Sequence, residues 1–333
     1  MIRPHLAAVK SYQTLRDSYI NKQAVYLDAN ENPFGEFNRY PDGDPIQLKK
    51  KMAEINHAKT ENLFLGNGSD ELIDLTMRIF CEPTKDSIMI MNPSFVMYEI
   101  YAKMNNLQVE KLQLNSDFEL EKDKFLGTVS KSKAKVLFLC SPNNPTGNSI
   151  DDLEFYIQNF SGIVVVDEAY IEFSKEISAV SLLHQYPNLI VLKTLSKAYA
   201  MAGLRIGVGF ASPEIADLFN QFKPPYNISS ESQRLALKEL QNIENLQNNI
   251  SIILKDRDAL KVGLEKINAI SRIFPSDANF FLIEFREVEL VYQKLLAENI
   301  LTSLRHPALK NCLRISVGTS EENSKLLNVL SQI

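Results

Sequence analysis

The amino-acid sequence predicts an α/β protein whose main domain contains a mostly parallel sheet with helices on both faces. Short runs of apolar and β-branched residues recur without polar alternation, and helical patterns stand between most of them. Strands that are buried on both faces have such continuous apolar runs, and their alternation with helices is typical of parallel sheets. The predicted strands are residues 87–91, 136–140, 162–166, 189–192 and 206–210.

Ahead of these strands, the pattern predicts an irregular arm and then a helix. Residues 1–35 end in LDANENPFG, whose Asn, Pro and Gly are typical of loops. SDELIDLTMRIFC has a Ser/Asp start and apolar residues at helical spacing, which predicts a capped helix over about 69–81. Further helical patterns separate most of the strands, at about 95–106, 153–160 and 213–223.

A second, smaller α/β domain is predicted from the C-terminal part, because a chain of 333 residues is too long for one ordinary core. A long helical pattern over about 229–267 leads to Pro275. Strand, helix, strand and helix patterns then follow in NFFLIEF, REVELVYQKLLAEN, CLRISVG and SEENSKLLNVLSQI. We expect an arm that forms part of the small domain over 1–35, a large domain over 36–228, and a long linking helix with the small domain over 229–333.

The composition argues against several classes of protein and site. The formal net charge of −5, without a basic patch, argues against nucleic-acid binding. We see no signal-peptide pattern and no apolar stretch long enough to span a bilayer, so we expect a cytoplasmic protein. The 3 cysteines are far apart and odd in number, which fits a reducing compartment. We expect no metal site, because no metal-ligand spacing occurs among His5, His57, His184 and His306.

Neighbouring predicted strands run directly into side chains that carry chemistry. SIMIM is followed by NPSF, VLFLC by SPNNPTGN, GIVVV by DEAY, and LIVL by KTLSK. These ends offer an aromatic ring, an amide, a carboxylate with a phenol, and a lysine flanked by hydroxyls. Ligands bind beyond the carboxyl ends of the strands in open α/β sheets, so the sequence predicts a binding site there.

This set of side chains suits pyridoxal phosphate. The cofactor needs a lysine for its aldehyde, an acid for its ring nitrogen, a flat apolar group over the ring and donors for its phenolate. Asp167 directly follows the apolar run Ile163–Val166 and is therefore placed to be a buried acid. Lys197 has Arg205 eight positions further on, and a nearby positive charge helps a lysine to lose its proton.

A cradle for the cofactor's phosphate is predicted at the start of the first helix. Backbone N–H groups point outwards at a helix N-terminus, and the helix dipole favours an anion there. The sequence GNGSDEL enters this helix, and further side-chain donors are available from Thr194, Ser196 and Arg205.

At this point the sequence resembles a known family. SPNNPTGN, VVVDEAYIEF and TLSKAYAMAGLRIG occur in the order and spacing of the fold-type I pyridoxal-phosphate aminotransferases. With LDANENPFG, NRYPDG and CLRISVGT, the chain is most similar to the histidinol-phosphate aminotransferases, from about residue 3 to 320. The resemblance implies a large domain with a seven-stranded-type sheet. It also implies transamination of L-histidinol phosphate with 2-oxoglutarate in histidine biosynthesis.

The resemblance implies a role for each residue around the cofactor ring. Lys197 would bind the cofactor's aldehyde and then act as acid and base in the 1,3-proton shift. Asp167 would pair with the ring nitrogen, and Asn144 and Tyr170 would hydrogen-bond the phenolate oxygen. Phe95 would stack on the ring where the family usually has Tyr or Trp, so that a π-face is kept and a polar group is lost. We therefore expect catalysis to depend on Lys197, Asp167 and Tyr170.

The resemblance also implies which residues bind the phosphate and the substrate. Tyr40 in NRYP would reach the phosphate of the neighbouring subunit's cofactor, so the active unit would be a homodimer. Arg314 in CLRISVG would hold an anionic group of the substrate, which its planar fork suits. Asn30, Asn32 and His5 would lie near the substrate. Within one subunit, the phosphate would be surrounded by Ser69, Asp70, Thr194, Ser196 and Arg205.

Other interpretations stay open at this point. An aromatic-amino-acid aminotransferase and a threonine-phosphate decarboxylase share the fold. A regulator built on the same fold would need a helix-turn-helix domain ahead of LDANENP, where the sequence has only about 25 residues. A nicotinamide-dependent enzyme is disfavoured, because the glycines at 203, 207 and 209 follow Lys197 and do not form a dinucleotide fingerprint after the first strand.

Overall fold

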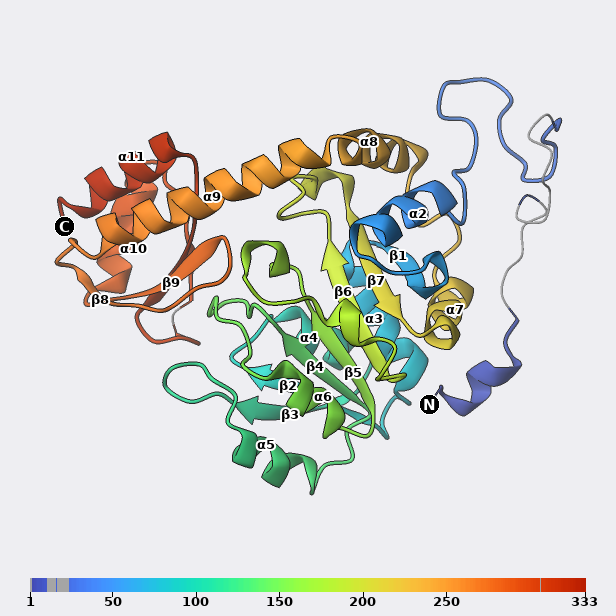
Figure 1. Ribbon diagram of the computed structural model, residues 1–333, viewed down its shortest axis with the longest axis horizontal. Coiled ribbons are helices and arrows are strands. Elements are labelled where there is room, and N and C mark those ends of the chain that lie inside the picture. Colours follow the sequence, from blue (N-terminus) through green and yellow to red (C-terminus); the bar gives the residue numbers. More distant parts are fainter. Residues whose placement is uncertain (1, 11–15, 17–23, 306) are drawn as a thin grey trace.

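The computed structural model describes residues 2–10, 16, 24–305 and 307–333. Figure 1 shows a large domain around a central sheet and a small domain at one end of the molecule, joined by the long helix α9. In the described residues, no helix combines the length and the apolar character needed to cross a membrane. His306 and residues 11–15 and 17–23 of the predicted arm lie outside this description.

The large domain contains a seven-stranded sheet in the order β1-β7-β6-β5-β4-β2-β3, which confirms the predicted fold class. All pairs are parallel except β1–β7 and β6–β7. The strands are β1 (Leu63–Asn67), β2 (Ser87–Asn92), β3 (Gln108–Gln113), β4 (Val136–Cys140), β5 (Ile163–Asp167), β6 (Leu189–Thr194) and β7 (Ile206–Ala211).

Two apolar cores lie on the two faces of this sheet, because successive strand residues point to opposite sides. In β5, Val164 and Val166 join one core while Ile163 and Val165 join the other. One face is covered by α3 (Ser69–Phe80), α4 (Met97–Met104) and α7 (Pro213–Phe222). The other is covered by α2 (Ile46–Ile55), α5 (Lys122–Val129), α6 (Leu153–Gln158) and α8 (Ser230–Leu240).

The linking helix differs from the prediction. The single helical pattern expected over 229–267 is two helices, α8 and α9 (Ile243–Leu264), which are separated at Gln241 and Asn242. Asparagine competes with helical hydrogen bonding and favours helix ends, and Asn242 is the N-cap of α9. Periodicity alone could not detect this break, because the apolar spacing continues across it.

The small domain has the predicted order of strand, helix, strand and helix, with two short strands added. Its antiparallel sheet has the order β10-β11-β9-β8. The elements are β8 (Ile270–Ile273), β9 (Phe280–Phe285), α10 (Val288–Ala297), β10 (Ser303–Leu304), β11 (Cys312–Ser316) and α11 (Ser320–Leu330).

The described part of the N-terminal arm does not contribute to the small domain, which corrects the expectation for residues 1–35. The short 3-10 helix Pro4–Ala8 is flanked by contacts to the large domain, where the N–H of Arg3 bonds to the carbonyl of Ile79 at 3.0 Å. Figure 1 shows the N-terminal segment on the side of the large domain that lies away from the small domain. The reason is apolar burial, since Ile2 packs against the core beneath α3.

Candidate active site

A cavity of about 260 Å³ lies where β4, β5 and β6 end, and the small domain contributes to its wall. The carboxyl ends of these parallel strands meet at one edge of the sheet, so motifs far apart in sequence converge there. Most of the residues expected in the site line this cavity: Ser69, Asp70, Phe95, Asn144, Asp167, Tyr170, Thr194, Ser196, Lys197, Arg205 and Arg314. Those not foreseen are Ser94, Val96, Cys140, Pro145, Ala169 and Arg305.

Lys197 stands in the connection between β6 and β7 and points into the cavity. Its Nζ lies 5.7 Å from the centre of the Tyr170 ring. Burial lowers the pKa of Lys197, and the positive charges of Arg314 and Arg205 lower it further. The sequence suggested Arg205 as the activating charge, and the structure adds Arg314 from the small domain. The side chain is therefore easier to convert to the neutral, nucleophilic amine than a surface lysine is.

Asp167 ends β5 as a buried carboxylate, as expected from the apolar run before it. Its Oδ1 accepts the N–H of Ala169 at 3.1 Å, and its Oδ2 accepts the hydroxyl of Tyr98 at 2.6 Å. Burial raises the pKa of Asp167 to about 6, against the hydrogen bond from Tyr98, which lowers it. The carboxylate is thus ionised at neutral pH but without a cation in direct contact, and a positively charged ring nitrogen would stabilise it.

Sequence reasoning missed Tyr98, which links two of the expected site residues. It is fully buried in α4, stacks on Phe138 at 4.9 Å and meets the ring of Phe95 edge-on at 5.6 Å. The only signal in the sequence is its position three residues after Phe95, one helical turn on. In the helix predicted over about 95–106, that spacing would place both on one face, but α4 begins at Met97 and the spacing does not reveal that Tyr98 turns towards Asp167.

Asn144, Tyr170 and Arg314 form a chain of polar contacts across the two domains. Arg314 Nη1 donates to Oδ1 of Asn144, and Nδ2 of Asn144 lies 3.5 Å from the Tyr170 hydroxyl. The guanidinium of Arg314 also lies over the ring of Phe280, 5.3 Å from its centre. Burial lowers the pKa of Arg314, so its charge lacks the solvation of a surface arginine.

Arg305 brings a second guanidinium into the same cavity. Its Nε is buried and has no hydrogen-bond partner in the described part of the chain. Burial and the charge of Arg314 both lower its pKa. Within the described residues, neither arginine forms an ion pair with a carboxylate, so this part of the site has positive charge that is free to meet an anion. Arg305 directly follows β10, whose two residues are too few to show a periodic pattern that could have indicated its direction.

The start of α3 lies at the pocket, where the anion cradle is expected, and its helix cap differs from the prediction. The N-cap is Gly68 with φ +77°, and it makes no side-chain cap. A Cβ on Gly68 would come within 2.6 Å of Arg205 Nη2, so glycine allows Arg205 to lie against the helix start. Arg205 Nη1 also donates to Ser196 Oγ at 3.4 Å, and Nη2 lies 3.7 Å from Asp70. An anion here would therefore be held by backbone N–H groups, hydroxyls and one shared guanidinium.

The remaining expected site residues lie outside this cavity. Tyr40 stacks on Tyr226 with ring centres 4.6 Å apart, and together with Asn30 it lines a separate cavity of about 530 Å³. Asn32 Oδ1 accepts the N–H of Phe34 at 3.0 Å. His5 Nδ1 lies 3.6 Å from Glu82, beyond the end of α3. One chain does not bring these four residues to the pocket, and their roles stay predictions.

Comparison with known proteins gives consistent results. The family model of aminotransferases of class I and II matches residues 12–330. The chain is 43% identical to a histidinol-phosphate aminotransferase of Cytophaga hutchinsonii, over 99% of this chain and 97% of that protein. Among solved structures, the histidinol-phosphate aminotransferase of Clostridium acetobutylicum matches with a TM-score of 0.81 at 26% identity, covering 89% of this chain and 90% of that one. A Sinorhizobium meliloti histidinol-phosphate aminotransferase in complex with pyridoxal-5'-phosphate has the same fold, with a TM-score of 0.81 at 21% identity, covering 91% of this chain and 89% of that one.

Proposed function

The chain belongs to the aminotransferase class I and II family, and from this premise we propose that it transfers the amino group of L-histidinol phosphate to 2-oxoglutarate. The products are 3-(imidazol-4-yl)-2-oxopropyl phosphate and L-glutamate, in a step of histidine biosynthesis. The full-length likeness to a histidinol-phosphate aminotransferase supports this substrate. The observation that carries the proposal is the pair Arg305 and Arg314, which line the same cavity as Lys197 and Asp167.

Pyridoxal 5'-phosphate is the cofactor of this chemistry, and the side chains of the pocket fit it. When bound, it withdraws electrons from the reacting carbon of the substrate. Lys197 offers an amine whose lowered pKa lets it bond to an aldehyde and take up and return a proton at Nζ. Asp167 would hold the proton of the ring nitrogen, because a buried carboxylate gains most from a cation beside it.

Other side chains of the pocket would contact the phenolate oxygen, the ring face and the phosphate of the cofactor. The Asn144 amide and the Tyr170 hydroxyl lie within 3.5 Å of each other and would share one acceptor, the phenolate oxygen. Phe95 lines the cavity and offers an apolar ring face, which Tyr98 supports from the edge. The start of α3, with Ser69, Ser196 and Arg205, would hold the phosphate.

The two arginines explain how one site can accept two different substrates. The carboxylate of 2-oxoglutarate is planar, and the phosphate of histidinol phosphate has three terminal oxygens. Both anions offer pairs of oxygens that match the donor fork of a guanidinium. In the described structure both arginines are partly desolvated, and only Arg314 is oriented by a side chain, through Asn144. We assign the substrate anion to Arg305 and Arg314 together.

The proposed active unit is a cytoplasmic homodimer in which Tyr40 of one subunit reaches the cofactor phosphate of the other. Tyr40 does not line the pocket of its own chain, and about half of its surface is exposed, at 51%. Both facts leave the residue available to a second copy.

The test is the visible absorbance spectrum of the purified protein with pyridoxal phosphate, before and after L-histidinol phosphate is added without an oxo acid. We expect the band of the lysine-bound cofactor to disappear and a pyridoxamine band to appear. A band that ignores histidinol phosphate but responds to phenylalanine or tyrosine would assign the protein as an aromatic-amino-acid aminotransferase. Release of carbon dioxide from threonine phosphate would indicate a decarboxylase. A protein that forms no band would overturn the role of Lys197.

A further inference from the structure

The carboxylate of Glu31 is the centre of a polar cluster that lies outside the cofactor pocket. Its side chain is only 4% exposed, although most of its neighbours in sequence are exposed. Arg16 Nη1 donates to Oε1 at 2.9 Å, and Arg16 Nη2 donates to Oε2 at 2.7 Å. A guanidinium that meets both carboxylate oxygens in this way forms the strong, directional type of ion pair.

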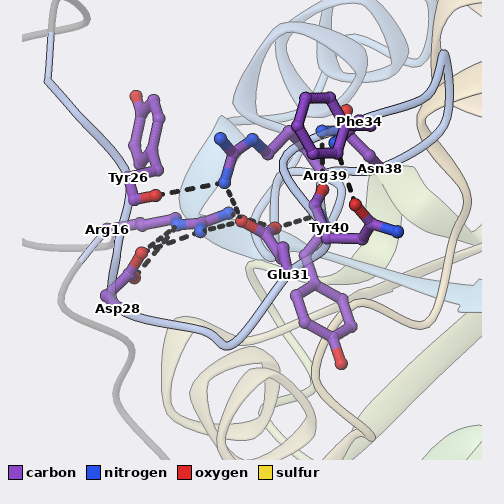
Figure 2. Close-up of polar contacts among 9 residues, drawn as sticks. Arg16, Tyr26, Asp28, Glu31, Phe34, Asn38, Arg39 and Tyr40 are labelled. Atoms are coloured by element: carbon purple, nitrogen blue, oxygen red, sulfur yellow. Dashed lines mark hydrogen bonds and ion pairs between the residues drawn. The ribbon is translucent and has the colours of Figure 1, made fainter.

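The other donors to Glu31 come from Arg39 and Tyr40. Arg39 Nη1 donates to Oε2 at 2.7 Å, and the backbone N–H of Tyr40 donates to Oε1 at 2.6 Å. Figure 2 shows Glu31 between the two arginines, with the ring of Tyr40 directed away from the carboxylate. Each oxygen of Glu31 thus accepts two hydrogen bonds, and these fix the backbone at the residue that carries the phenol.

Further contacts join the segment 24–42 to Arg16 and to itself. Asp28 Oδ2 accepts from Arg16 Nε at 3.1 Å, and the carbonyl of Tyr26 accepts from Arg39 Nη1 at 3.1 Å. The described residues 24–42 contain no helix or strand, so side-chain contacts take the place of secondary structure here. Pairing with Arg16 above all lowers the pKa of Glu31 to about 2, so the cluster stays charged at any physiological pH.

The same segment directs large apolar side chains outward. Leu27 is 88% exposed and Phe34 is 81% exposed, while the carboxylate of Glu31 is turned inward. This arrangement is the reverse of an ordinary surface loop. Large exposed apolar side chains that gather on one segment are typical of a contact surface.

The segment lies beside the phosphate end of its own pocket without entering it. Tyr40 stacks on Tyr226, and the carbonyl of the next residue, Asn227, accepts from Asn67 Nδ2 at 3.0 Å. Asn67 is the last residue of β1, and α3 begins at Ser69 with the anion cradle. Two copies that meet through this flank in two-fold contact would bring Tyr40 of each next to the phosphate end of the other, because the same patch faces itself.

We propose that Glu31 is a positioning residue that holds Tyr40 on a preformed segment, which docks on a second copy of this chain and meets that copy's cofactor phosphate. The inference rests on the proposed function and its homodimer. Glu31 touches neither substrate nor cofactor, and it acts through Tyr40.

The first test compares Glu31→Gln with the same change at the exposed Glu36 of the same segment. We expect Glu31→Gln to raise the dissociation constant of pyridoxal phosphate, followed by fluorescence, about tenfold, which is what the loss of one hydrogen bond to a charged group costs. The far-UV circular dichroism should stay unchanged, and Glu36→Gln should bind like the wild type. If Glu31→Gln does not fold, Arg39→Gln removes one donor while the Arg16 pair remains. Wild-type cofactor affinity in whichever variant folds would overturn the proposal.

The second test asks in which subunit Glu31 acts. Glu31→Gln and Lys197→Ala chains are co-expressed with different affinity tags, and only mixed dimers are purified. One site of each mixed dimer then has Lys197 from one chain and Glu31 with Tyr40 from the other. At a pyridoxal phosphate concentration near the wild-type dissociation constant, we therefore expect about half of the wild-type rate per dimer. No recovery with Glu31→Gln, but recovery when Tyr40→Phe is mixed with Lys197→Ala, would mean that Glu31 serves its own subunit and would contradict the inference. A wild-type dimer that ignores histidinol phosphate would refute the proposed function instead, and the cofactor affinities would still report on Glu31.

Discussion

Two buried carboxylates, Asp167 in the pocket and Glu31 in the segment 24–42, have opposite electrostatic surroundings. Burial raises the pKa of Asp167 to about 6, whereas arginine partners lower the pKa of Glu31 to about 2. In the pocket, Asp167 has no cation in direct contact, and Arg305 and Arg314 have no carboxylate within the described residues. A region whose charges are already paired holds a backbone in place, while a region with unpaired charges of both signs is built to receive a ligand.

Among the substitutions that test this comparison, replacing Lys197 should have the largest effect on turnover. Lys197→Ala removes the nucleophilic amine, so turnover should fall by about 10⁴-fold or more. Steady-state rates with histidinol phosphate and 2-oxoglutarate measure this, with the exposed Lys131→Ala as the control. Normal rates in Lys197→Ala would place the chemistry outside the pocket described here.

Removing one of the unpaired positive charges should have the next largest effect. Arg305→Gln takes away a guanidinium to which we assign the substrate anion, so the KM for histidinol phosphate should rise about a hundredfold, with a smaller change in kcat. Arg272→Gln is the control, because its guanidinium pairs with Asp117 away from the pocket. An unchanged KM would assign the substrate anion to Arg314 alone.

The raised pKa of Asp167 predicts a change in the stability of the cofactor-free protein with pH. Its folded-state pKa of about 6 lies above the ordinary value of 3.8, so the folded carboxyl binds its proton more tightly than the unfolded one. Stability is therefore lost as the pH rises from about 4 to 6. Asp167→Asn should abolish activity but stabilise the cofactor-free protein at pH 7 by about 3 kcal/mol.

Urea unfolding of both proteins at pH 4 and pH 7 measures this effect. The difference between wild type and Asp167→Asn should be small at pH 4 and large at pH 7. An equal difference at both values would show that the asparagine acts through packing and that the charge of Asp167 is not destabilising. In the same measurement at pH 7, Glu31→Gln should be less stable than the wild type, since the charge of Glu31 is fully paired.

Tyr98→Phe gives the smallest expected effect and tests whether the pocket depends on its supporting residues. Loss of the hydroxyl removes one of the two donors to Asp167, which raises the pKa of the carboxyl and weakens its hold on a cationic ring nitrogen. We expect the dissociation constant of pyridoxal phosphate to rise about tenfold at pH 7, and more at pH 6. Tyr156→Phe is the matched control, because it removes a buried hydroxyl that donates to the carbonyl of Leu120.

The predicted strands and the residues at their ends agree closely with the structure, whereas edge strands and the course of irregular segments were not predicted. All of the predicted apolar runs are strands, but β1, β3 and β8 were missed. The sequence of β3, QVEKLQ, is half polar, as an edge strand can be. β10 was missed because it has only two residues. The break between α8 and α9 and the course of the N-terminal arm depend on packing between segments that local periodicity does not describe.

The sequence by itself determined the fold class and the identity of the groups at the strand ends. It could do so because buried parallel strands have a local signature, and the geometry of a parallel sheet brings their ends to one edge. Only the tertiary structure decided that Tyr98 reaches Asp167, that Arg305 joins Arg314, and that Glu31 turns inward while Tyr40 turns outward. These directions arise where a helix, a second domain and an irregular segment pack, and local periodicity does not describe the contacts that fix them.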